Sequence, residues 1–270
     1  MLQSIILHNP LVMFWCNRRL IHSLALATVA SRYRSSWLGM LWPVIQPVLM
    51  IGVFSFIFSF VMPLRWGSGA GGHDLPLFLY SGFVVFSFFS DVVTRAPTLI
   101  LEKPHLVRKV VFPVELLAGV SVLIGAGYFL INFVVLCAFL WLQGYPVENG
   151  FVFLVLYLPA LALGLTGLSW FLSALTVYVH DTAQVIGLAV SALMFFTPVF
   201  YPLSSVAEGV RFWLLMNPLT HVIEGLRALV LEDSMPSVRD VISFWVIAGV
   251  VFLFGWFWFR RLKGGFSDVL

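Results

Sequence analysis

Few side chains in this 270-residue sequence have the types and spacing that metal or acid–base chemistry requires. His221 and Glu224 match the first half of a helical metal-binding motif, but no second histidine completes it. The adjacent residues His180 and Asp181 have no nucleophile that the sequence can assign to them, so a turn is the simpler interpretation. These residues predict neither a metal site nor a catalytic centre, and we expect that the chain is not an enzyme.

The sequence also lacks the residues that nucleotide hydrolysis and ion-driven transport require. No G-x-x-x-x-G-K-[ST] phosphate loop occurs in the sequence, so we expect no cofactor in this chain. A proton relay needs carboxylates or histidines within the membrane, whereas the long apolar stretches contain only Asp91 and Glu115, both near a predicted cytoplasmic end. Any active transport therefore needs an energy source outside this chain.

The composition indicates whether the chain folds in water or in a membrane. Hydrophobic residues make up 61% of the chain and charged residues 10%, whereas soluble domains carry about 25% charged residues. The excess apolar surface must face lipid, so we predict an all-α polytopic membrane protein. The net charge of +3 does not indicate nucleic acid, because membrane proteins collect Lys and Arg in their cytoplasmic loops.

Apolar runs of spanning length predict six transmembrane helices. Their approximate ranges are 38–62, 75–94, 114–142, 151–177, 182–200 and 241–259. The first run has no charge and follows Arg32 and Arg34, which are expected to stay on the cytoplasmic side. The resulting topology places most of the Lys and Arg residues on the side of both termini. We therefore predict a multi-pass protein of the cytoplasmic membrane with both termini in the cytoplasm.

Residues 1–37 are predicted to form a cytoplasmic segment before the transmembrane domain of 38–270. The stretch Leu20–Ala30 is too short to span a membrane and lies between arginines, which favours a helix lying along the inner leaflet. An ordinary cytoplasmic helix packed on the bundle is the alternative.

The segment between the fifth and sixth predicted spans, 201–240, is too apolar for a plain loop. Ser205 and Glu208 have the spacing of a capping box, which predicts the start of one short helix. Asn217 followed by Pro218 predicts the start of a second helix. Two helices too short to span suggest a hairpin that re-enters the outer leaflet, and a pair of helices resting on the outer surface is the alternative.

Three separated motifs resemble the permease subunits of the ABC-2 transporter family, in the branch that exports O-antigen, teichoic acid and capsule polysaccharides. The first motif is Arg32–Gly39 with Leu41-Trp42-Pro43 and Pro47, the second is Leu106–Val110 with Phe112, Pro113 and Glu115, and the third is Pro198–Pro202 with Asn217-Pro218 and Arg227. The chain departs from this pattern at Ala25–Ala30 and at Val114, where the family usually has more charge.

The resemblance implies a homodimer of permeases with two separate ATPase subunits, which would bind ATP and Mg. It also implies a cytoplasmic coupling helix between the second and third spans, seated in the ATPase. The residues expected to make this contact are Glu102, Pro104, Leu106, Arg108, Lys109, Phe112 and Pro113. A plain basic loop on the cytoplasmic side is the alternative interpretation of the same segment.

The resemblance also implies a substrate pathway. We define the cytoplasmic gate as the residues expected to meet a lipid-linked, diphosphate-bearing substrate: Arg32, Tyr33, Arg34, Trp37 and Trp42. Candidates for the channel and its external exit are Phe195, Phe196, Tyr201, Asn217, Glu224 and Arg227. For the aromatic residues among them, contact with lipid or core packing is the competing interpretation.

These inferences predict the permease of an ATP-driven exporter that moves a lipid-linked, O-antigen-like polysaccharide across the cytoplasmic membrane. The expected partners are a second copy of the chain, two ATPase subunits, the glycan substrate and membrane lipid, and no nucleic acid. An ABC-2 permease for a small hydrophobic drug or lipid is one alternative. A stand-alone channel or a membrane enzyme acting on lipid-linked sugars is another.

Overall fold

The structure, a computed structural model, describes residues 9–34, 36–61, 75–103, 112–145 and 147–269, and every regular element in them is helical. Within these ranges, five helices are long and apolar enough to cross a membrane. They are Gly39–Phe56 (the 3₁₀ turn η1, Gly39–Leu41, with α4, Trp42–Phe56), α5 (Leu75–Arg95), α8 (Leu116–Leu142), α10 (Leu158–Tyr178) and α14 (Val238–Lys263). The chain is therefore a multi-pass membrane protein, as predicted.

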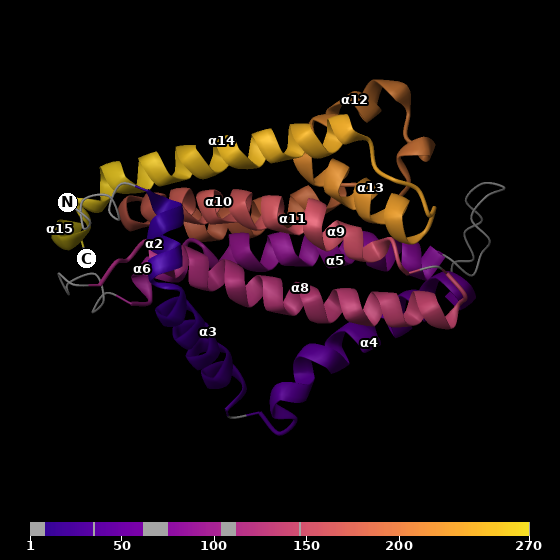
Figure 1. Cartoon of the computed structure of the whole chain (residues 1–270), viewed down its shortest axis with the longest axis horizontal. Helices are drawn as coiled ribbons and strands as arrows, with labels where there is room; N and C mark the ends of the chain where they lie inside the picture. Colours follow the sequence, from indigo (N-terminus) through magenta and orange to yellow (C-terminus); the bar gives the residue numbers. More distant parts are fainter. Residues whose placement is uncertain (1–8, 35, 62–74, 104–111, 146, 270) are drawn as a thin grey trace.

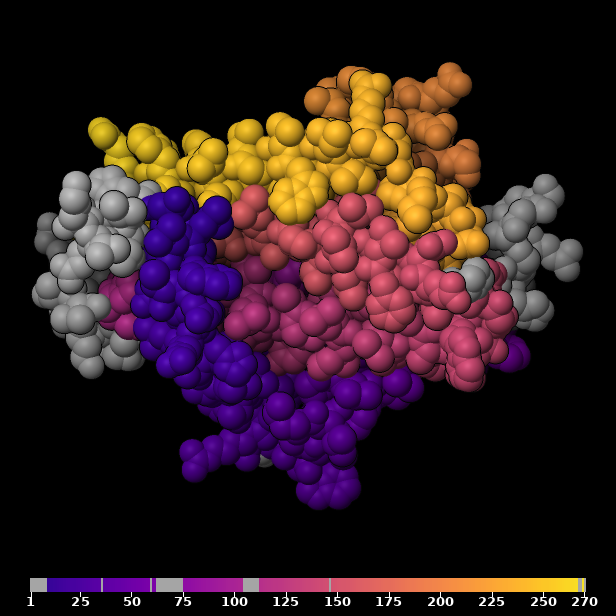
Figure 2. Space-filling view, viewed as in Figure 1, coloured from indigo at the N-terminus to yellow at the C-terminus, as the bar shows by residue number. Residues whose placement is uncertain are grey.

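The long helices α5, α8, α10 and α14 run side by side along the longest axis (Figure 1). The short helices α2 (Pro10–Cys16), α6 (Thr98–Leu101) and α15 (Phe266–Val269) lie at one end of this bundle. Helices α3 (Arg18–Tyr33) and α4 diverge from the bundle to form a V, and its apex stands out from the body in Figure 2. A π-helical turn, Ile57–Val61, extends α4.

The prediction of one continuous span over 151–177 is wrong. The chain forms α9 (Gly150–Leu156) and then α10, with an interruption at Tyr157. Pro159 lies in the first turn of α10 and has no N–H to continue a helix from the preceding turn. Proline is favoured at this position for the same reason, so the interruption is also a well-formed helix start.

The fifth predicted span, 182–200, ends earlier than predicted. Helix α11 covers Thr182–Phe195, which is 14 residues. At 1.5 Å per residue this is about 21 Å, less than the roughly 30 Å of the hydrocarbon layer. The chain then turns through 196–202, where Pro198 and Pro202 disfavour further helix.

The N-terminal helices pack on the end of the bundle that also contains the end of α14. The Phe14 ring of α2 stacks on Trp170 of α10 with centroids 5.6 Å apart and planes 6° apart. A buried cluster at this end joins Met13 and Ile21 to residues of α8, α10 and α14. Helix α2 thus belongs to the bundle, whereas the predicted position of Leu20–Ala30 relative to the inner leaflet stays a prediction.

Helices α10 and α14 approach each other until their backbones touch. A Cβ atom built on Gly255 would overlap the Gly167 carbonyl oxygen and lie 2.7 Å from the Gly167 Cα. A Cβ on Gly167 would in turn lie 2.7 Å from the Phe252 backbone nitrogen. Small residues permit this kind of approach in lipid, where close packing drives helix association.

The segment between α11 and α14 contains the two predicted short helices, α12 (Glu208–Met216) and α13 (Pro218–Val230), with a 3₁₀ turn η3 (Leu203–Ser205) before them. The capping box is wrong: α12 has Ala207 at its N-cap, and the Ser205 hydroxyl donates to the Pro202 carbonyl 2.8 Å away. The start of α13 is confirmed, because the Asn217 side chain accepts a hydrogen bond from the Leu219 N–H at 3.0 Å.

Candidate functional site

A polar cavity of about 360 Å³ lies between α3, α4, α5, α8 and α11. Its charged lining residues are Arg32, Asp91 and Arg95, and the amides of Gln46 and Asn132 also line it. It extends along α5 from Arg95 to Phe83, about 18 Å at 1.5 Å per residue. Charged residues within a membrane-spanning helix are energetically costly and usually mark a functional site, so this cavity is the first candidate site.

Asp91 and Arg95, four residues apart on one face of α5, form an ion pair between Asp91 Oδ1 and Arg95 Nη2. The second carboxylate oxygen, Asp91 Oδ2, is buried and has no partner among the described residues. The Tyr128 hydroxyl is also buried, and its polar neighbour is the Tyr33 side chain. Arg32 lies 5.8 Å from the centroid of the Tyr128 ring. The walls of the cavity thus contain the Arg32 guanidinium, the ion pair of Asp91 and Arg95, and the buried Tyr128 hydroxyl beside Tyr33.

The structure divides the residues of the cytoplasmic gate between different surroundings. Arg32 and Tyr33 line the polar cavity. Tyr33 and Arg34 line a second cavity of about 670 Å³, whose other lining residues are almost all apolar and come from α3 and η1. Trp37 lies at the apex of the V with 97% of its surface exposed. Trp42 donates from Nε1 to the Ser36 hydroxyl at 2.8 Å, which closes the α3–α4 turn instead of facing a cavity.

The coupling residues fall largely outside the described residues. Pro104, Leu106, Arg108 and Lys109 lie in the range 104–111, of which nothing is described. Glu102 follows α6 directly, and Phe112 and Pro113 lead into the start of α8. Their role in ATPase contact stays a prediction.

Glu115, two residues after Pro113, joins three elements at this end of the bundle. Its Oε1 accepts a hydrogen bond from Lys263 Nζ of α14 at 2.6 Å, and its carbonyl oxygen accepts one from Trp170 Nε1 of α10 at 2.9 Å. The Glu115 side chain is 7% exposed and that of Lys263 37% exposed. The chain that leaves the predicted coupling segment is therefore fastened to two transmembrane helices.

We expect Lys263→Met to destabilise the protein by about 2 kcal/mol, below the 3–5 kcal/mol of fully buried pairs because Lys263 is partly hydrated. The double variant Glu115→Gln/Lys263→Met should recover part of that loss, since no buried charge is then left without its partner. Thermal unfolding of the detergent-purified variants measures both effects. With Glu115→Gln measured as well, a double variant that loses the sum of the two single losses would contradict the coupling of these two side chains.

At the opposite end of the bundle, α13 is fastened to the segment that follows α11. Asn217 donates from Nδ2 to the Thr197 hydroxyl at 2.9 Å. The apolar face of α13 packs against the bundle, and its residues Leu219, Val222, Ile223, Leu226 and Leu229 are all buried. Two polar residues of α13, Thr220 and Arg227, are buried as well.

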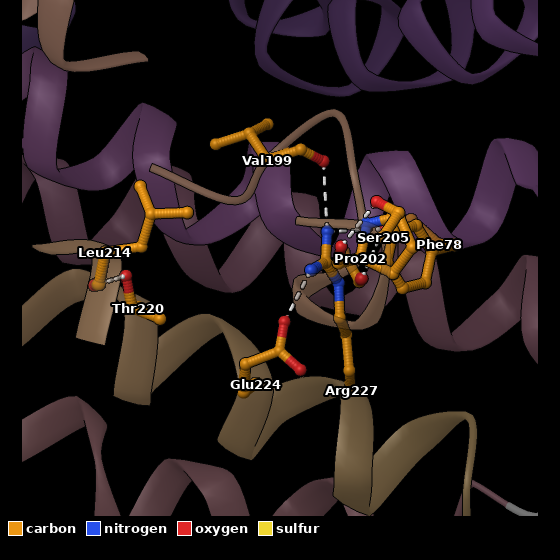
Figure 3. A network of polar contacts seen from close by, with 9 residues as sticks. Phe78, Val199, Pro202, Ser205, Leu214, Thr220, Glu224 and Arg227 are labelled. Carbon is orange, nitrogen blue, oxygen red and sulfur yellow. Dashed lines mark hydrogen bonds and ion pairs between the residues drawn. The ribbon is translucent and has the colours of Figure 1, made fainter. Parts of the chain in front are cut away.

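Arg227 is the centre of a buried polar network (Figure 3). Its guanidinium donates to Glu224 Oε1 at 2.8 Å, to the Val199 carbonyl at 3.0 Å and to the Phe78 carbonyl of α5 at 3.3 Å. It also lies 3.6 Å from the centroid of the Phe78 ring. Burial lowers the pKa of Arg227 to about 10 and the Glu224 carboxylate opposes this shift, so the group stays charged at neutral pH.

Of the remaining exit candidates, Glu224 belongs to this network, whereas Phe195, Phe196, Tyr201 and Asn217 make other contacts. Phe195 and Phe196 at the end of α11 are about two-thirds exposed, and the Tyr201 hydroxyl donates to the Phe195 carbonyl at 2.9 Å. Asn217 and Glu224 are occupied by Thr197 and Arg227. The exit candidates therefore include structural contacts, and a role in a pathway stays a prediction for each of them.

Sequence reasoning missed Tyr128, Asn132 and Gly82. Tyr128 and Asn132 are ordinary polar residues within an apolar run, and only the packing of α8 against α5 brings them to Asp91. Gly82 leaves room for Arg227, because a Cβ there would lie 2.8 Å from its Nη2. The polarity of Tyr128 and Asn132 within an apolar run was a usable sequence signal. Nothing in the sequence indicates the role of Gly82.

No group of three or more His, Cys, Asp or Glu side chains that could hold a metal ion occurs among the described residues. His221 of the incomplete metal motif contacts protein groups through both ring nitrogens. Its Nε2 lies 2.9 Å from the Leu215 carbonyl oxygen and its Nδ1 lies 3.6 Å from Asp240 Oδ1. These contacts join α12, α13 and α14. His221 is thus a structural residue in this fold.

Known proteins similar to this chain include O-antigen export permeases and a polysialic acid transport protein. The O-antigen export system permease protein RfbA of Klebsiella pneumoniae is 25% identical over 244 residues, covering 88% of this chain and 90% of the relative. RfbA of Myxococcus xanthus is 26% identical over 237 residues, covering 87% and 88%. The polysialic acid transport protein KpsM of Escherichia coli is 24% identical over 217 residues, covering 78% and 81%. Residues 19–231 match the family described as ABC-2 type transporter. This chain therefore belongs to the ABC-2 type transporter family.

Proposed function

We propose that this protein is the permease of an ATP-driven exporter that moves a lipid-linked polysaccharide across the cytoplasmic membrane. Permeases of this family pair with ATPase subunits, and nucleotide is bound there. The single observation that supports a glycan substrate most strongly is the similarity, over most of the chain, to permeases of O-antigen export and polysialic acid transport. The polar cavity supplies a compatible site within the membrane domain.

The assembly we propose has two copies of this chain and two ATPases, with both termini in the cytoplasm. Helix α11 is the short fifth crossing, completed on the outer side by the 196–202 turn. Because α11 ends after about 21 Å and Asn217 reaches Thr197 at that point, we place α12 and α13 inside the outer leaflet as a re-entrant hairpin.

In this proposal the substrate meets the cytoplasmic gate at Arg32, Tyr33 and Arg34, beside the V formed by α3 and α4. Its anionic headgroup is attracted by Arg32, which has no ion-pair partner among the described residues. ATPase movement reaches the permease through 102–113, and the network of Glu115 passes it to α10 and α14. The hairpin fastened by Arg227 closes the outer end.

We expect inverted vesicles that contain the permease and its purified ATPase to accumulate a labelled lipid-linked glycan when ATP is present. Vesicles supplied with a non-hydrolysable ATP analogue are the control, and their uptake should stay at background. Equal uptake in the two conditions would contradict coupled export. Uptake of a hydrophobic dye but not of the glycan would instead identify a permease for small hydrophobic molecules.

A further inference from the structure

His221 is a point at which three helices meet. It belongs to α13, which lies with α12 beside the start of α14 (Figure 1). Its Nε2 lies 2.9 Å from the carbonyl oxygen of Leu215, near the end of α12, and its Nδ1 lies 3.6 Å from Oδ1 of Asp240, in the first turn of α14. One imidazole thus faces both the other helix of the α12–α13 hairpin and the transmembrane helix beside it.

The contact with Leu215 determines which nitrogen of the neutral ring carries the hydrogen. A carbonyl oxygen only accepts hydrogen bonds, so Nε2 must be the N–H that donates. In the neutral ring Nδ1 is then an acceptor, and it faces a carboxylate oxygen of Asp240, which is also an acceptor. The separation of 3.6 Å is beyond hydrogen-bond range. The neutral imidazole therefore holds α12 but makes no bond to α14.

Protonation of the ring turns the contact with Asp240 into an attractive one. A proton taken up from water at Nδ1 adds a second N–H donor and a positive charge, while Nε2 keeps its bond to Leu215. Asp240 lies in the first turn of α14, where the helix dipole favours a negative charge. Charge-assisted N–H···O bonds are about 2.7–2.9 Å long, so a small approach of α13 towards α14 completes the pair.

The surroundings of His221 are acidic. It lines a cavity of about 450 Å³ whose other titratable lining residues, from the hairpin, α14 and the interruption before α10, are Glu224, Glu232, Asp240 and Tyr157. No lysine or arginine is among the described residues that line this cavity. Arg227 of α13 is bonded to Glu224, and Arg211 of α12 and Arg239 of α14 are exposed outside the lining. The local charge therefore attracts a positively charged imidazolium.

We infer that His221 is a proton-sensitive latch between the α12–α13 hairpin and α14. Histidine is the side chain whose charge ordinarily changes between pH 5 and 8. At the acid end of this range the ring donates from both nitrogens and holds the hairpin against α14, and at the alkaline end only the Leu215 bond remains. The consequence for export rests on the proposed function: because the hairpin is proposed to close the outer end, acid on the outer side should slow glycan export.

Amide hydrogen exchange of the permease–ATPase complex in nanodiscs measures the latch directly, because it reports local opening. After correction for the intrinsic pH dependence of exchange, amides of α12 and α13 should exchange about 1.5- to 5-fold more slowly at pH 6 than at pH 8, the range of partly exposed ion pairs. This range applies because the side chains of His221 and Asp240 are 22% and 45% exposed.

His221→Asn should remove this pH dependence, since an amide can still donate to Leu215 but does not change its charge. Asp240→Asn should remove most of it while the histidine is retained, and it tests the latch even if His221→Asn fails to accumulate. His22→Asn, which replaces an exposed histidine of α3, is the matched control and should keep the full pH dependence. Equal pH dependence in wild type and His221→Asn would overturn the latch. Dependence that persists in Asp240→Asn would overturn Asp240 as its partner.

The consequence for export is measured in inverted vesicles, whose lumen corresponds to the outer side. The lumen is buffered at pH 6 or pH 8 while the ATPase side stays at one pH. Wild-type uptake of glycan should be slower with the acid lumen, and His221→Asn should lose this difference. Uptake that responds equally to luminal pH in both proteins would overturn the consequence for export. Absence of ATP-dependent uptake at either pH would instead contradict the proposed function and leave the exchange result unaffected.

Discussion

Gly255→Leu is expected to prevent accumulation of the folded permease in the membrane. Even a Cβ at this position would overlap the Gly167 carbonyl oxygen, and the atoms in the way are backbone atoms that cannot rotate aside. Helices α10 and α14 would have to separate along their contact. We expect Gly255→Ala to cost more than about 3 kcal/mol, the upper end of ordinary overpacking. Fluorescence-detected size exclusion and thermal unfolding in detergent measure the two variants.

Gly249→Ala provides a matched control on the same helix, since a Cβ there meets nothing within 4 Å. This substitution should be neutral or slightly stabilising, because alanine is the better helix former. A loss of stability at Gly249 equal to that at Gly255 would indicate a general sensitivity of α14 to side chains. The specific contact between α10 and α14 would then not be its cause.

Arg227→Met should destabilise the external hairpin and abolish glycan uptake. The variant leaves the Val199 and Phe78 carbonyls without their donor, at an expected cost of about 3 kcal/mol, the lower end for a broken buried pair. The lower end applies because Glu224 is 36% exposed and can be hydrated. Arg227→Lys should be intermediate, since a lysine keeps the charge but cannot donate in a planar fork.

Arg211→Met on the neighbouring helix α12 is the control for a lost positive charge, because Arg211 is exposed. It should leave thermal unfolding within about 0.5 kcal/mol of wild type. If Arg227→Met unfolds at the same temperature as Arg211→Met, the network does not stabilise the hairpin. If the Arg227→Met variant stays folded and also takes up glycan normally, Arg227 has no role in closing the outer end.

Membrane character and most of the spans were predictable, because length and apolar composition alone determine whether a helix can cross lipid. The start of α13 was predictable for a local reason: Asn217 and Pro218 act within one turn. Ser205 and Glu208 also gave a local signal, the spacing of a capping box, but that prediction was wrong. The η3 turn uses its hydroxyl for the Pro202 carbonyl, and Leu203 is buried as the chain turns there.

Arg227 illustrates why the candidate site was only partly predictable. On a helical projection it belongs to the polar face of α13, which suggests exposure. Its acceptors come from Phe78 and Val199, far away in sequence, and their carbonyls carry no sequence signal. The Asp91–Arg95 pair was accessible to prediction because both residues lie on one helix. Tyr128 lies on another helix, so its polarity within an apolar run could be noticed, but its position beside Asp91 could not be predicted.

The contact between Gly167 and Gly255 joins residues that are made at different times during synthesis. Helix α10 is the most buried of the candidate spans, with 67% of its apolar window buried, and α14 covers part of that surface. Until the ribosome has delivered α14 to the membrane, the glycine face of α10 must be covered by lipid or by the insertion machinery. The nascent permease is therefore expected to reach its final packing late, and to be a target of membrane quality control until then.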